Sequence, residues 1–186
     1  MSQARGVLPE APKRRAALSR ARRTAGAART IEGSLDGGDL SIGVVASRFN
    51  DEICRPLLEG ALAALRRHGV SEDRTVVVRV PGAFEIPTAA RHLARSKRWD
   101  AIVCVGAVIR GETPHFDWVA GEAARGISSV ALETGVPVLF GLVTVNTVEQ
   151  ARDRAGGRLG NRGSDAAEAA IEMAHVTRAL TRKRGR

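Results

Sequence analysis

Aromatic residues, cysteines and long apolar runs are all scarce in this 186-residue chain. Its aromatic residues are four Phe and two Trp, and Tyr is absent. Cys54 and Cys104 form at most one disulfide and lack metal-ligand spacing, which argues against a secreted disulfide scaffold or a zinc ribbon. The longest apolar run, residues 101–109, is well short of the roughly 20 residues that cross a bilayer. We therefore expect a single cytoplasmic domain that does not cross a membrane.

The net charge of +9 is concentrated at the two ends of the chain. Residues 1–38 contain eight basic and three acidic residues, and residues 177–186 contain five basic residues and no acidic one. Residues 39–176 therefore carry a net charge of −1. A domain that binds nucleic acid normally has its basic patch on the folded part, so we expect nucleic-acid binding only through the basic arm, if at all.

The first 38 residues are mostly Ala, Arg, Gly and Pro, a composition that buries too little apolar surface to offset the entropy of ordering. We predict a disordered basic arm over 1–38, a folded domain over 39–180 and a basic tail over 181–186. The arginine-rich arm is also compatible with an organelle transit peptide, although it has only three Ser. A secretory signal is disfavoured because no apolar segment follows the arginines.

Apolar runs alternate with helical patterns after residue 39. The runs are rich in Val and Ile and lack strict polar alternation, which is typical of buried parallel strands; they are 40–46, 75–80, 101–109 and 137–143. Three-and-four spacing predicts helices over 53–65, 86–93, the segment from Pro114 to Val130, 148–154 and a last helix capped by Ser164. We expect Pro56 to delay or kink the first helix. The order predicts an α/β fold, a three-layer α/β/α sandwich with a four-stranded parallel sheet.

Ligands of such sheets bind beyond the carboxyl ends of the strands, which directs attention to four segments: 47–50, 81–85, 110–115 and 144–147. Phe49 and Phe84 there suggest a flat ligand that stacks on aromatic rings, although each ring is equally well explained as core. Glu85 accepts hydrogen bonds from ligand hydroxyls or caps the next helix.

The turn at 111–113, followed by Pro114, predicts a helix start whose N–H groups bind phosphate. His115 in that first turn suits proton transfer, because the helix dipole favours its neutral ring, although such a histidine is often only a surface residue. Arg154 is a candidate phosphate clamp, or part of a solvated basic hinge over 152–163. Glu112, His115 and Asp117 lack a nearby second His, so we expect no metal.

Five stretches, taken together and in this order, resemble the 6,7-dimethyl-8-ribityllumazine synthase family over about residues 40–180. They are SRFN at 47–50, VPGAFEIP at 80–87, GAVIRGETPHFDWV at 106–119, and the segments 137–155 and 160–174. The resemblance implies a flavodoxin-like fold and a transferase of riboflavin biosynthesis. This enzyme condenses 5-amino-6-(D-ribitylamino)uracil with 3,4-dihydroxy-2-butanone 4-phosphate and uses neither a metal nor an organic cofactor.

The resemblance also implies roles for individual residues. Phe49 would stack on the pyrimidine with Asn50 beside it, Glu85 would bind the ribityl hydroxyls, and His115 would transfer protons. The turn of Gly111, Glu112 and Thr113 would bind the phosphate together with Arg154. Arg162 replaces a lysine that is common in the family, which keeps the charge and changes its shape. The remaining substrate-binding positions implied are Ala83, Phe84, Val108, Ile109 and Phe140.

The family's sites lie between adjacent subunits of a homopentamer, so the resemblance implies that Phe140 and Arg154 come from the neighbour. Because residues 156–163 contain no insertion, we expect twelve pentamers to close into an icosahedral capsid of 60 subunits. Riboflavin synthase is then a possible partner. Two alternatives remain open: a shell or scaffold whose arms bind nucleic acid or acidic cargo, and a carrier of flavin or lumazine.

Overall fold

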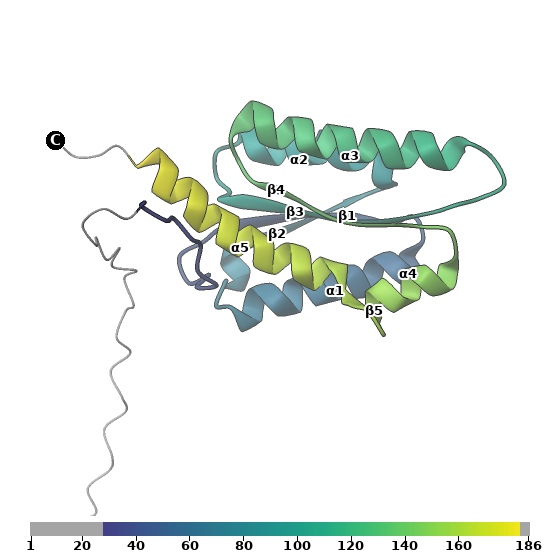
Figure 1. The fold of residues 1–186 in the computed structure, drawn as a ribbon, viewed down its shortest axis with the longest axis horizontal. Helices are drawn as coiled ribbons and strands as arrows, with labels where there is room; N and C mark the ends of the chain where they lie inside the picture. The colour runs from purple at the N-terminus through teal and green to yellow at the C-terminus, as the bar shows by residue number, and fades with distance from the viewer. Residues whose placement is uncertain (1–27, 183–186) are drawn as a thin grey trace, which may run out of the picture. The chain divides into compact units, whose positions relative to one another are not determined.

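The computed structural model describes residues 28–182 (Figure 1). Its four long strands are β1 (Ile42–Ser47), β2 (Thr75–Val80), β3 (Ala101–Ile109) and β4 (Val138–Val145). They form one parallel sheet in the order β2-β1-β3-β4. All six residues of β1 and all but the last of β3 are buried, which explains their uninterrupted apolar sequences. The predicted four-stranded parallel sheet is confirmed.

Helices cover both faces of this sheet, as Figure 1 shows. One face carries α1 (Asp51–Arg67), α4 (Val148–Arg154) and α5 (Arg162–Thr181), and the other carries α2 (Ile86–Arg95) and α3 (His115–Thr134). Short 3₁₀ turns lie at Glu72–Arg74 and Ala83–Glu85. The predicted three-layer sandwich is confirmed, and the strand order is that of flavodoxin-like folds. None of the helices within 28–182 is both long and apolar enough to cross a membrane.

The core consists of two apolar layers, one on each face of the sheet. In β1, Val44 faces the layer under α1 and α5, and Val45 faces the layer under α2 and α3. The α1 and α5 helices approach closely at Gly163, where an added Cβ would overlap the carbonyl of Leu57. This contact requires glycine in the first turn of α5.

Two details of the helix starts differ from prediction. Asn161, rather than Ser164, caps α5: its Oδ1 accepts hydrogen bonds from the amides of Gly163 at 2.9 Å and Ser164 at 3.1 Å. The glycine-rich segment forms a small antiparallel pair, β5 (Ala155–Gly157) and β6 (Gly160–Asn161), which holds Asn161 in the extended conformation that a cap requires.

Pro56 does not delay α1, which begins at Asp51. Proline in a helix removes one backbone hydrogen bond, but seven residues of α1 are buried against the sheet and α5, and this burial outweighs the loss.

The arm predicted over 1–38 lies largely outside the described residues, as does most of the predicted tail, since residues 1–27 and 183–186 are not described. The compact unit begins at Ile31, earlier than the predicted boundary at residue 39. Residues 31–38 form no helix or strand, yet Gly37 donates a hydrogen bond to the carbonyl of His68 at 2.8 Å. Gly33 lies against the backbone of Glu172, where a side chain would overlap it. Small residues therefore let this irregular segment pack on the domain.

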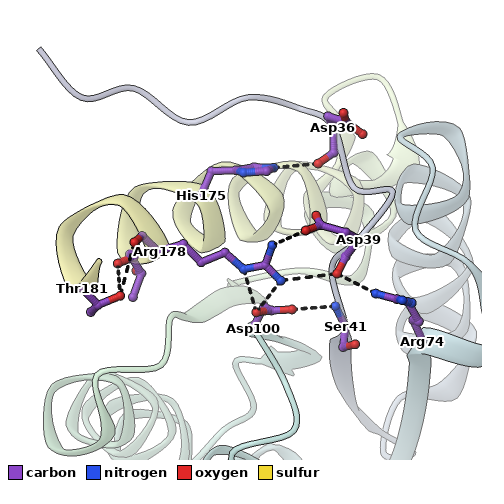
Figure 2. A network of polar contacts seen from close by, with 9 residues as sticks. Asp36, Asp39, Ser41, Arg74, Asp100, His175, Arg178 and Thr181 are labelled. Atoms are coloured by element: carbon purple, nitrogen blue, oxygen red, sulfur yellow. Dashed lines mark hydrogen bonds and ion pairs between the residues drawn. The ribbon is translucent and has the colours of Figure 1, made fainter. Parts of the chain in front are cut away.

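A polar network at the amino edge of the sheet fastens the same segment to α5 (Figure 2). Arg178 of α5 forms ion pairs of 2.8 Å with both Asp39 and Asp100. Asp100 also accepts a hydrogen bond from the Ser41 amide at 2.8 Å, and His175 donates one to the Asp36 carbonyl at 2.7 Å. The network joins the entry to β1, the start of β3 and the end of α5, on the edge opposite the carboxyl ends of the strands.

Candidate functional site

A cavity of about 370 Å³ lies at the carboxyl edge of the sheet. Three connections and the first turn of α3 form its walls, because the carboxyl ends of β1, β2 and β3 lie side by side in the parallel sheet. Ten of the predicted site residues line it: Phe49, Asn50, Ala83, Phe84, Glu85, Val108, Ile109, Gly111, Thr113 and His115.

The connection after β1 presents Phe49 and Asn50. The Phe49 amide donates to the carbonyl of Pro81 at 3.0 Å, which extends the pairing with β2 beyond the end of the strand. Asn50 has a left-handed backbone with φ of 58°, a conformation that asparagine adopts more readily than most residues. Its Nδ2 donates to the Ala107 carbonyl of β3 at 3.3 Å. The Phe49 ring remains 69% exposed at the cavity.

The connection after β2 is a 3₁₀ turn that carries Phe84 and Glu85. Phe84 is 57% exposed, although Ala83 beside it is buried. Within the described part of the chain, no hydrogen bond is made to the Glu85 carboxylate, so both oxygens are available to a ligand. Exposed aromatic rings on two sides of one cavity are uncommon on a monomer surface and indicate a binding site for a flat apolar group.

The connection after β3 leads into α3, whose first residue is His115. Pro114 precedes it at the cap position, and among residues 28–182 no side chain caps this helix start. The amides of His115 and Phe116 are therefore open to an external acceptor, whereas the Asp117 amide donates to the Pro114 carbonyl at 3.0 Å. The helix dipole favours an anion at this helix start. Gly111 has no side chain, and the position that a Cβ would take is open space, with nothing within 4 Å. The predicted oxyanion-binding turn and His115 thus lie in one wall of the cavity.

Cys54 lies beneath the Phe49 connection and is buried. Its thiol donates to the Phe49 carbonyl at 3.0 Å. Burial raises the pKa of the Cys54 thiol to about 11. The thiol is therefore protonated near neutral pH and supports the loop without supplying a nucleophile.

Four predicted site residues do not line the cavity of the single chain: Glu112, Phe140, Arg154 and Arg162. Phe140 is 45% exposed on β4, the strand at one edge of the sheet, where it pairs with Cys104, well before the end of β3. Arg154 ends α4 and donates to the Gln150 carbonyl at 3.0 Å. Arg162 begins α5 and forms an ion pair with Asp165 at 2.9 Å.

The sequence prediction did not include four residues that line the cavity: Gly82, Ala107, Phe116 and Val119. Two signals for them were present. Phe116 follows His115 directly in the first turn of α3, and Val119 lies four residues after His115 and three after Phe116, so Val119 shares a helix face with each of them. Ala107 precedes Val108 in a strand that is buried on both faces. It lies at the cavity beside Asn50, whose side chain donates a hydrogen bond to the Ala107 carbonyl.

The cavity combines flat apolar walls, a free carboxylate, open helix amides and an imidazole, a set suited to binding an aromatic, hydroxylated molecule beside an anionic one. A family model for 6,7-dimethyl-8-ribityllumazine synthase matches residues 39–178. The match spans most of the chain and includes all of the cavity-lining residues. The chain therefore belongs to the 6,7-dimethyl-8-ribityllumazine synthase family, which is a family of transferase enzymes of riboflavin biosynthesis.

Proposed function

We propose that this protein condenses 5-amino-6-(D-ribitylamino)uracil with 3,4-dihydroxy-2-butanone 4-phosphate to form 6,7-dimethyl-8-ribityllumazine. The 5-amino group adds to the ketone and loses water to give an imine, phosphate is eliminated, and the second amine closes the ring with loss of another water. The observation that carries this proposal is the single cavity in which exposed Phe49, Glu85 and His115 lie together with a helix start that favours anions. No metal or organic cofactor takes part in the proposed reaction.

The aromatic substrate occupies the wall formed by the first two connections. The flat uracil ring stacks on Phe49, whose exposed face supplies apolar contact, and Asn50 hydrogen-bonds the ring. Ala83, Phe84, Val108 and Ile109 contribute contacts around it. The free Glu85 carboxylate accepts hydrogen bonds from the ribityl hydroxyls. Arg162 adds positive charge near the pyrimidine once subunits assemble.

The phosphorylated ketone occupies the wall at the start of α3. The amides of the 111–113 turn and of the first turn of α3 bind its phosphate, and Arg154 supplies a bidentate guanidinium. His115 then transfers protons between the amine, the ketone oxygen and the leaving groups. Most of the acceleration comes from fixing the two reactants next to each other in one cavity.

The site is completed by a neighbouring subunit in a homopentamer. The positions of Phe140 and Arg154 support this arrangement, because both lie outside the cavity of their own chain and Phe140 is exposed on an edge strand. We further propose that the pentamers close into a 60-subunit shell that can associate with riboflavin synthase. The two buried free cysteines fit a reducing cytoplasm.

The test is formation of the fluorescent lumazine from the two purified substrates, compared with the uncatalysed rate. His115→Ala should lower kcat at least about tenfold while leaving the KM values close to wild type. His92→Ala is the matched control, because His92 is exposed on α2 and does not line the cavity. A folded, assembled wild-type protein that fails to accelerate the reaction would refute the proposal.

A second pair of variants tests the phosphate clamp. Arg154→Ala should raise KM for the phosphorylated ketone and leave KM for the uracil unchanged, because only the ketone carries the anion. Arg152→Ala is its control on the same helix, where Arg152 forms an exposed ion pair with Glu52 at 3.5 Å. An effect of Arg154→Ala confined to the uracil would contradict the clamp.

A further inference from the structure

Arg110 is the residue at which β3 leaves the sheet, directly before the turn that leads to α3. Its backbone amide donates to the Val145 carbonyl at 2.9 Å, which continues the pairing of β3 with β4 beyond Ile109. Its side chain does not line the cavity and is 43% exposed. The guanidinium therefore starts from a fixed backbone and extends outside the cavity wall.

Three groups from two other segments surround this guanidinium. Its Nη2 lies 2.9 Å and its Nη1 3.4 Å from the two carboxylate oxygens of Asp117. Its central carbon lies 4.1 Å from the centroid of the Phe116 ring, a stacking distance. Its Nε donates to Asn146 Oδ1 in the β4–α4 connection at 3.1 Å. The two Nη atoms thus share Asp117, the Nε hydrogen-bonds Asn146, and the face of the guanidinium lies over Phe116.

Two of these partners immediately follow His115 in the first turn of α3. Two further contacts hold that turn: the Asp117 amide donates to the Pro114 carbonyl at 3.0 Å, and Phe116 packs on the apolar layer under α2 and α3. Within 28–182 no side chain caps the helix start. Asn146, the partner of Arg110 in the β4–α4 connection, is itself held in place, because its amide donates to the side chain of Gln150 at 3.0 Å. Arg110 thus links the α3 turn to β3 and to the β4–α4 connection.

We propose that Arg110 is a positioning residue for His115, an inference that rests on the function proposed above. An exposed ion pair contributes little to overall stability, so the effect of this cluster lies in the geometry of the turn. By holding Phe116 and Asp117, the guanidinium fixes the direction in which the His115 imidazole enters the cavity. The stacked Phe116 ring lines the same cavity, so the clamp also sets the wall beside the imidazole.

The test measures kcat and both KM values for Arg110→Gln, with Arg125→Gln as the matched control. Arg125 forms an exposed ion pair with Glu122 on the same helix at 3.3 Å and lies outside the cavity lining. Arg110→Gln should lower kcat at least about tenfold with KM for the uracil within about twofold, because misplacing a catalytic group by 1 Å costs on the order of 100-fold. Arg110→Lys should not restore the rate, because a lysine keeps the charge but lacks the planar fork.

Two further variants keep the inference testable if Arg110→Gln does not fold. Asp117→Ala and Asn146→Ala each remove one partner and should each lower kcat selectively. Asp117→Ala combined with Arg110→Gln should be no slower than the slower single variant, because both changes break the same clamp.

Full kcat in folded Arg110→Gln, or in folded Asp117→Ala and Asn146→Ala, would overturn the inference, as would multiplicative losses in the double variant. These outcomes are interpretable only with an active wild type; an inactive wild type refutes the proposed function instead.

Discussion

Replacing Asn161 by alanine tests how the second half of the domain is held together. The Asn161 side chain caps α5 through the amides of Gly163 and Ser164, and its Nδ2 donates to the Pro56 carbonyl of α1 at 2.9 Å. It also packs directly on Gly60, so one side chain joins the glycine-rich segment, α5 and α1. Asn161→Ala removes all of these interactions.

The expected loss follows from two contributions. An N-cap of this kind stabilises a helix by about 1 kcal/mol. The partly buried hydrogen bond to Pro56 adds about 1 kcal/mol. The sum of about 2 kcal/mol corresponds to a fall in Tm of roughly 4 to 8 °C for a domain of this size.

Thermal and urea unfolding at one fixed subunit concentration measure this difference, because assembly makes stability depend on concentration. Ser164→Ala is the matched control, since the Ser164 hydroxyl has no hydrogen-bond partner among residues 28–182 and should lose less than about 0.5 kcal/mol. Equal losses in the two variants, or a loss below about 0.5 kcal/mol for Asn161→Ala, would refute the assignment of the cap.

Three other predictions concern stability and reactivity. Burial raises the pKa of both cysteine thiols, that of Cys54 to about 11, so a thiol reagent at pH 8 should modify neither residue until denaturant is added; rapid modification of the folded protein would contradict this. The hydrogen bond from Arg67 lowers the pKa of Glu168 below its usual 4.5, so the stability that this carboxylate contributes is present above pH 4.5 and is lost as the pH falls through the lower folded pKa. Glu168→Gln should cost less than about 1 kcal/mol at pH 7, and the difference in stability between the two proteins should shrink as the pH is lowered below 4.5. Gly141→Ala should destabilise by about 1 to 3 kcal/mol, because its Cβ would lie 2.9 Å from the Cys104 carbonyl, whereas Gly121→Ala on α3 has open space and should be neutral or stabilising; the reverse order in urea unfolding would be inconsistent with the packing.

The sheet was predictable because its two central strands, β1 and β3, are buried on both faces. The observed bounds of β2 and β3 coincide with the predicted runs at 75–80 and 101–109. All of β3 except its last residue is buried, whereas β2 is a partly exposed edge strand that its run of Val predicts. The cavity followed from the same topology, since ligand sites of parallel sheets lie beyond the strand ends. The sequence alone therefore predicted that Phe49, Glu85 and His115 lie in one cavity.

Contacts that depend on tertiary geometry were not predictable in the same way. Both Asn161 and Ser164 are residue types that cap helices well, and the β5–β6 pair determines which of them does so here. This pair could not be predicted from the sequence, because its strands are only three and two residues long and rich in glycine. The Arg110 clamp joins residues from three segments and has no sequence periodicity. The packing of residues 31–38 depends on glycines that otherwise suggest an unstructured arm.

Complementation between two impaired variants tests the central claim of a lumazine-forming site shared by neighbouring subunits. His115→Ala and Arg154→Ala proteins are unfolded together in equal amounts, refolded, and assayed at a low concentration of the phosphorylated ketone, where each variant alone is slow. If His115 and Arg154 act in one site from adjacent subunits, random mixing gives about a quarter of the sites both native groups, and activity should rise to about a quarter of wild type. Activity that stays at the average of the two variants in mixed, assembled protein would contradict a shared site.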